Sequence, residues 1–252
     1  MPFAPVNGIQ LYYEVHGPEI GTAPVVVFAH GAGGNHISWW QQVPHFARTR
    51  TCVTFDQRRY GQSADTNGLG GAAYADDLAG LLEHLGIGEF DLVAQSMGGW
   101  TSLAFALKYP GRIRRLVMAD THGGMQVPGL KLERQPIPPG AHPAIGPRMD
   151  EEQRALAFLY RQIMALTPPL EPAELFAHLQ SIGAPTVEQV RTLEFPVLCI
   201  IGEEDLSIPP ALLEAAATHY PNATVARVPT AGHSVYFERP ERFNELVEAF
   251  LA

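Results

Sequence analysis

One serine, one histidine and two aspartates in this chain have the types and the order that nucleophilic catalysis needs. Ser96 stands in AQSMGG, His233 in TAGHSVYFERPERF and Asp205 in GEEDLSIPP, and Asp120 closes the run RRLVMAD. A serine hydroxyl attacks a carbonyl carbon when a base takes its proton, and the base needs a carboxylate that orients it and stabilises its charge. The order Ser, Asp, His is satisfied with either aspartate.

The residues around Ser96 predict a tight turn between a strand and a helix. The apolar run FDLVAQ precedes the serine, and WTSLAFALKYP has a helical pattern after it. Ala94 and Gly98 are small residues two positions away on either side, so the strained turn of a G-x-S-x-G motif can hold the hydroxyl over a sheet edge. Ala94 replaces the usual glycine, which the turn tolerates if no positive φ is needed there. The alternative is that Ser96 is only a helix N-cap residue.

His233 is the preferred general base among the ten histidines. It lies in a turn between the last strand-like run and the final helix, so it is expected to hang over the same sheet edge as Ser96. The histidines that fall within helical patterns are expected to be exposed: His84, His178 and His219.

Two acids compete to orient His233, and both follow a predicted strand. Asp205 is preferred because its strand and the strand that leads into the His233 loop are consecutive, and consecutive strands are usually neighbours. Asp120 is the alternative acid. Glu203 and Glu204 are then expected to be solvated loop charges.

Two backbone N–H groups are candidates for binding the oxyanion of a tetrahedral intermediate. Met97 offers one at the start of the helix after the serine. The loop HGAGG at 30–34 offers the second donor, for which Ala32 is the first choice and Gly33 the second choice. Such a loop also suits phosphate binding, but no G-K-[ST] follows it.

Composition restricts the class of protein. The 252 residues are 46% hydrophobic, enough for one sizeable core, and the formal charge of −9 argues against nucleic acid as a partner. No leader-like segment and no apolar stretch of about 20 residues occurs, so a soluble cytoplasmic protein is expected. The only cysteines, Cys52 and Cys199, lie in apolar runs and are expected to be inert, and no cofactor or metal is implied.

Strand-like and helical segments alternate, which predicts a parallel sheet with helices on both faces. The strand-like runs are IQLYYEV, PVVVFAH, TCVTFD, FDLVAQ, RRLVMAD, FPVLCIIG and ATVARVP, and the helical segments are 73–85, 97–109, 209–218 and 241–251. Residues 121–195 interrupt this rhythm with a proline-rich passage and two helical patterns, in which Asp150 is placed to cap the first helix and Pro172 to open the second. We therefore predict a core domain of 1–120 and 196–252 and a helical cap of 121–195.

Over essentially its whole length the chain resembles the α/β-hydrolase superfamily. The motifs that carry the resemblance are HGAGG, DQRRYGQS, AQSMGGW, GEEDLSIP and AGHSVYFERPERF. The resemblance implies the α/β-hydrolase fold with a helical cap insertion, Ser96 as nucleophile, Asp205 as acid and His233 as base. In DQRRYGQS, Arg59 replaces the glycine that is usual in the family.

The resemblance implies a serine esterase or lactonase that acts on a small or medium, hydrophobic carboxylic ester or lactone, with this small molecule as its partner. Relatives that open epoxides or remove halide use Asp at the position of Ser96, which disfavours those activities. Relatives that cleave C–C bonds often carry Trp where this chain has Ser234. C–C bond hydrolysis, perhydrolysis, a low-turnover ligand receptor and a homo-oligomeric state stay open as alternatives.

Overall fold

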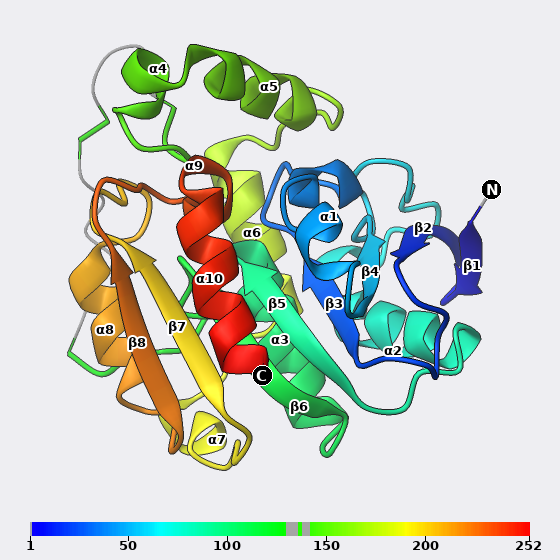
Figure 1. The fold of residues 1–252 in the computed structure, drawn as a ribbon. Coiled ribbons are helices and arrows are strands. Elements are labelled where there is room, and N and C mark those ends of the chain that lie inside the picture. Colours follow the sequence, from blue (N-terminus) through cyan, green and yellow to red (C-terminus); the bar gives the residue numbers. More distant parts are fainter. Residues whose placement is uncertain (1, 130–135, 138–141) are drawn as a thin grey trace.

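An eight-stranded sheet forms the centre of the protein in the computed structural model, which describes residues 2–129, 136–137 and 142–252 (Figure 1). Its strands are β1 (Phe3–Val6), β2 (Ile9–His16), β3 (Val25–Ala29), β4 (Thr51–Phe55), β5 (Phe90–Gln95), β6 (Ile113–Ala119), β7 (Val197–Gly202) and β8 (Ala223–Val228). Their order is β1-β2-β4-β3-β5-β6-β7-β8. Strands β3 to β8 pair parallel with one another, whereas β1 pairs antiparallel with β2 and β2 pairs antiparallel with β4. The predicted mostly parallel sheet is confirmed.

The central strands are buried on both faces, which explains their nearly continuous apolar sequences. All five residues of β3 are buried. Val26 and Phe28 pack into the hydrophobic cluster under α1 (Val43–Phe46), α9 (Val235–Glu238) and α10 (Pro240–Leu251). Val25 and Val27 face the opposite cluster, under α2 (Tyr74–His84), α3 (Met97–Lys108) and α8 (Pro210–Ala217). Side chains that alternate between two apolar layers hold the sheet between two sets of helices.

The predicted core elements match observed ones closely, but strand β1 and the short helices α1, α7 (Val187–Val190) and α9 were not predicted. The four expected helices correspond to α2, α3, α8 and α10, with ends that differ by one residue. Strand β1 was not predicted because FAPV is short and contains a proline, which suits only an edge strand. Here β1 is one of the two edge strands of the sheet, and β2 is its neighbour.

Between β6 and β7 the described chain forms α4 (Met149–Glu152), α5 (Arg154–Met164), α6 (Pro172–Ile182) and α7 (Val187–Val190). In Figure 1, α4 and α5 lie above the sheet, across the end at which β5 and β7 finish. Pro172 opens α6, as expected. Asp150 does not cap a helix: Gln153, at φ −135°, separates α4 from α5, and the Asp150 carboxylate accepts a hydrogen bond from Arg161 at 2.7 Å instead. The proline-rich passage falls partly outside the described residues.

Two further expectations concern the cysteines and the membrane. Cys52 and Cys199 are buried, and burial raises the pKa of both thiols to about 12, so neither forms a thiolate near neutral pH. Across the described parts of the chain, no helix has the length and apolarity needed to cross a bilayer.

Candidate active site

Ser96 occupies a strained turn between β5 and α3. Its φ of 48° and ψ of −115° fall outside the regions that residues with a side chain favour. The turn is tied to the next strand, because the backbone N–H of Ser96 donates to the carbonyl of Ala119 at 3.1 Å. The Thr121 hydroxyl donates to the carbonyl of Ser96 at 2.7 Å. Backbone strain that is held by neighbouring hydrogen bonds in this way is characteristic of functional sites.

The two small residues beside Ser96 have different reasons to be small. A Cβ on Gly98 would lie 2.1 Å from the carbonyl oxygen of Ala29, so only glycine lets the helix start against β3. Ala94 lies inside β5, pairs with Ala29 and Met118, and is not among the residues with positive φ. Alanine therefore fits at position 94 without strain in the turn.

Ser96, His233 and Asp205 come together at the carboxyl ends of three strands. The Ser96 Oγ lies 2.8 Å from His233 Nε2, and His233 Nδ1 lies 2.8 Å from Asp205 Oδ2. A carboxylate accepts only, so Nδ1 carries the ring hydrogen and Nε2 is free to accept the serine proton. The other oxygen of Asp205 accepts from the backbone N–H groups of Ser207 and Ile208 at 2.7 and 2.9 Å, which fixes the carboxylate.

The environment of His233 favours its charged form despite its burial. Burial acts to lower the pKa of the imidazole, but the charge and the hydrogen bond of Asp205 outweigh it, and Asp120 and Glu238 add to the effect, so the pKa of His233 is raised above 6.5. A base with a raised pKa takes a proton from serine more readily.

Asp120 lies near the same site but does not hydrogen-bond to His233. Its Oδ1 accepts from the backbone N–H of Gly202 at 2.8 Å, and its Oδ2 accepts from that of Val235 at 3.1 Å. Burial, followed by the negative charge of Asp205, raises the pKa of the Asp120 carboxyl well above its usual value. Asp120 thus connects the end of β7, which leads into the loop of Asp205, to the segment after His233. Of the two predicted acids, Asp205 is the one that hydrogen-bonds to the imidazole.

The loop that carries His233 is held by side chains that the sequence did not single out. The buried carboxylate of Glu238 accepts from the backbone N–H groups of Gly146, Gly232 and Ser234 at 3.0, 3.0 and 3.2 Å. Gln95 donates to the carbonyl of His233 at 2.7 Å. The signal for Glu238 was present in the motif AGHSVYFERPERF, but the pattern alone does not say which backbone groups a glutamate will reach.

The two expected oxyanion donors lie in a loop and at a helix start. Met97 is the first residue of α3, so its N–H has no acceptor within the helix. In the described part of the chain, neither the Met97 N–H nor the Ala32 N–H makes a backbone hydrogen bond. A Cβ on Gly31 would lie 3.2 Å from the Cβ of Ser96, which places the loop beside the serine. Gly33, the second choice, has a φ of 81° and packs against the Met164 methyl group.

A small apolar cluster adjoins these groups. It consists of Tyr60, Tyr74, Met97, Trp100 and Ile182, with Ala32 packed against it. His178, expected to be exposed, is half-buried beside this cluster, and its Nε2 lies 2.7 Å from the hydroxyl of Tyr74. That expectation was wrong because this face of α6 packs against the segment 70–74, which covers part of the His178 side chain.

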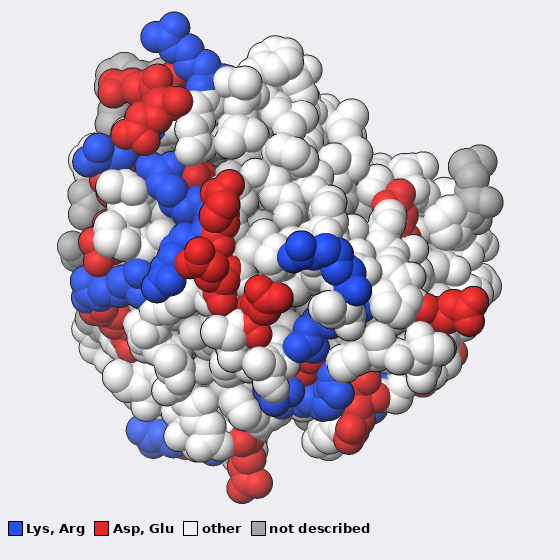
Figure 2. Space-filling model, in the orientation of Figure 1, with Lys and Arg blue, Asp and Glu red and all other residues white. Residues whose placement is uncertain are grey.

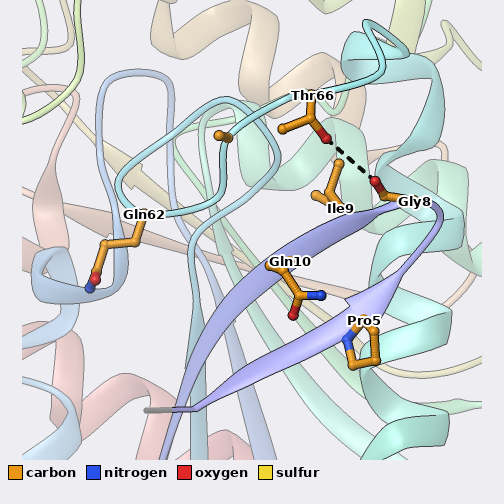
Figure 3. Close-up of a pocket in the computed structure, with 7 residues that line it drawn as sticks. Pro5, Gly8, Ile9, Gln10, Gln62 and Thr66 are labelled. Atoms are coloured by element: carbon orange, nitrogen blue, oxygen red, sulfur yellow. Dashed lines mark hydrogen bonds between the residues drawn. The ribbon is translucent and has the colours of Figure 1, made fainter.

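The surface hollow in Figure 3 is separate from the triad. It measures about 440 Å³ and is lined by Pro5, Gly8, Ile9, Gln10, Gln62, Ala64 and Thr66. None of these residues is ionisable, and the hydrogen bond across it joins the Thr66 hydroxyl to the carbonyl of Gly8 at 3.4 Å. It therefore offers no acid, base or activated nucleophile.

No group of three or more His, Cys, Asp or Glu side chains within the described ranges is arranged to hold a metal ion.

Comparison with known proteins supports the same fold. The family model described as the alpha/beta hydrolase fold matches residues 24–141. The RutD protein of Caulobacter sp. (strain K31), provisionally named a carbamate hydrolase, is 27% identical over 96% of both chains. A thermophilic esterase from Thermogutta terrifontis has a TM-score of 0.81 at 26% identity, covering 99% of this chain and 97% of its own. The enol-lactonase from Burkholderia xenovorans LB400 has a TM-score of 0.78 at 24% identity, covering 99% of both chains, which shows likeness of fold.

Proposed function

Because this chain belongs to the α/β-hydrolase superfamily, we propose that it is a serine hydrolase that cleaves a small or medium, uncharged carboxylic ester or lactone. The observation that carries the proposal is the continuous pair of 2.8 Å hydrogen bonds from Ser96 through His233 to Asp205. Such a series of hydrogen bonds activates a serine hydroxyl, which is otherwise a weak nucleophile.

The reaction runs through an acyl-enzyme. His233 Nε2 takes the proton of Ser96 as its Oγ attacks the carbonyl carbon, and Asp205 stabilises the imidazolium that forms. The N–H groups of Ala32 and Met97 bind the oxyanion. The imidazolium then protonates the leaving alkoxide, and a water molecule, deprotonated by His233, releases the acid and restores the serine. In a lactone the leaving alkoxide stays attached to the acyl group.

The surroundings of Ser96 favour an uncharged substrate. The cluster that adjoins Met97 consists of tyrosine, tryptophan, methionine and isoleucine side chains. In Figure 2, charged side chains gather along α10 and β8, and the surface over much of α5 carries few. Residues 121–195 are proposed as the cap over this site, and the rest of the chain as the core domain. The likeness to an esterase is in line with this substrate class.

Turnover of a series of p-nitrophenyl esters and aliphatic lactones of graded length, by the wild type and by Ser96→Ala, tests the proposal. We expect Ser96→Ala to abolish turnover, and we expect short to medium acyl chains to be preferred. Full activity of Ser96→Ala would refute the assignment. Turnover of a carbamate or of a C–C ring-fission product, measured in the same way, tests carbamate and C–C bond hydrolysis, and added peroxide tests perhydrolysis. A single turnover with retained product would identify a ligand receptor.

A further inference from the structure

His30 is a fully buried histidine with a different partner at each ring nitrogen. The backbone N–H of Gln57 lies 2.9 Å from Nε2, and the carbonyl oxygen of Gly31 lies 2.8 Å from Nδ1. A backbone N–H can only donate, so Nε2 accepts, and the single hydrogen of a neutral imidazole is on Nδ1, from which it is donated to Gly31. Burial lowers the pKa of His30 to about 4, so the ring stays neutral near pH 7.

The carbonyl that His30 contacts belongs to the same peptide group as the Ala32 N–H. The carbonyl of Gly31 also accepts from the backbone N–H of Gly34 at 3.1 Å. Two donors on one carbonyl fix the plane of the peptide and polarise it, which makes the N–H at its other end a better aimed and stronger donor. This peptide lies beside the nucleophile, because a Cβ on Gly31 would be 3.2 Å from the Cβ of Ser96.

His30 is in turn connected to the helix that begins at Met97. The side-chain amide of Gln57 donates to the carbonyl of His30 at 2.7 Å, and its oxygen accepts from the Thr101 hydroxyl at 2.5 Å. Thr101 lies in α3, one helical turn after Met97. A continuous series of buried hydrogen bonds therefore runs from the loop of one oxyanion donor to the helix of the other.

We propose that His30 is a positioning residue of the oxyanion hole. It orients the Gly31–Ala32 peptide and, through Gln57 and Thr101, holds the Ala32 N–H in a fixed position relative to the Met97 N–H. The proposal rests on the function proposed above. It assigns no contact between His30 and substrate: His30 acts only through the peptide that it holds.

Two conservative variants separate the two ring nitrogens. In His30→Asn the side-chain amide lies near the place of Nδ1 and can still donate to Gly31, whereas His30→Gln reaches the place of Nε2 and cannot. We expect His30→Gln to lower kcat on a short p-nitrophenyl ester by about 10- to 100-fold with little change in KM, because a misaimed donor costs most in the transition state. We expect His30→Asn to stay within about fivefold of wild type, as most of that donor geometry is retained. The affinity for an alkyl boronic acid, whose Ser96 adduct is tetrahedral, should fall in parallel with kcat.

A second pair of variants tests the connection to α3. Thr101→Val removes the hydroxyl that donates to Gln57. It should lower kcat by about threefold to tenfold, because the series of hydrogen bonds is then broken at its α3 end. Ser102→Ala is the matched control, because the Ser102 hydroxyl donates to the carbonyl of Gly98 in its own helix at 2.8 Å and is not part of the series through Gln57. Thermal unfolding of each variant shows whether it is folded.

The inference is overturned if His30→Gln and His30→Asn lose kcat equally, if the loss is in KM alone, or if boronic acid affinity does not change. Its failure is distinguishable from that of the proposed function. If Ser96→Ala still turns over the ester, the proposed function is wrong; if Ser96→Ala is inactive while His30→Gln is fully active, only the role of His30 is wrong.

Discussion

The carboxylate of Asp205 and the imidazole of His233 lie 2.8 Å apart across 28 positions of sequence, and the second oxygen of Asp205 is held by two backbone N–H groups of its own loop. The carboxylate is thus oriented before it meets the histidine. Each oxygen of Asp120 instead accepts a hydrogen bond from a backbone N–H, and neither of these two bonds comes from the imidazole.

This difference between the two aspartates predicts unequal effects of amide substitution. Asp205→Asn should lower kcat by about 10³- to 10⁴-fold, because an amide does not hold the imidazole in the required tautomer or stabilise its charge. Asp120→Asn should lower kcat by about tenfold, since asparagine keeps an acceptor for only one of the two backbone N–H groups. Steady-state kinetics on one ester checks both, with circular dichroism to verify folding. A larger loss at Asp120 would reverse the assignment of the acid.

The pH dependence follows from the raised pKa of His233. The base must be neutral, so kcat/KM should be low in acid and rise with a midpoint above pH 6.5. In Asp205→Asn the carboxylate that raises the pKa is gone while burial still lowers it, so the midpoint of the residual activity should move to lower pH. Rates from about pH 5 to 9 measure both midpoints. A midpoint that does not move in Asp205→Asn would contradict this account of the pKa.

Substitution of the two small residues near Ser96, Ala94 and Gly98, should have different effects on activity and stability. Ala94→Gly should keep kcat within about twofold and cost about 1 kcal/mol of unfolding free energy, because a buried methyl group is lost and a glycine enters a strand. Gly98→Ala should cost about 1–3 kcal/mol and most of the activity, since its Cβ would meet the carbonyl of Ala29 at 2.1 Å. Urea unfolding and ester turnover measure the two effects. Loss of activity in Ala94→Gly would show that alanine itself shapes the turn.

Arg59 adopts a φ of 82°, a conformation that glycine favours. Arg59→Gly should therefore raise the unfolding free energy by about 0.5–1 kcal/mol, the relief of strain being partly offset by the greater freedom of glycine in the unfolded chain. Arg59→Ala is the control, because alanine keeps the strain. Both variants also lose the exposed hydrogen bond of 3.3 Å to the carbonyl of Pro168. Equal unfolding free energies for glycine and alanine would rule out backbone strain as a cost at this position.

The sequence by itself determined the layers of the fold. The runs VVVFA and VLCII are apolar at every position, and a strand with both faces buried needs that composition. The order of strands and helices then places Ser96, Asp120, Asp205 and His233 at one edge, because the carboxyl ends of parallel strands meet there. Local propensity did not reveal β1, whose strand pairing depends on β2.

Only the tertiary structure decided which of these edge residues meet. Asp120 and Asp205 both follow strands in the right order, and the choice between them depends on where two loops direct their carboxylates. The bonds from His30 to Gln57, and from Gln57 to Thr101, span 27 and 44 positions of sequence. Periodicity reports how each segment buries its own side chains, whereas contacts between loops depend on how those segments pack, so pairings of this kind appear only once the chain is folded.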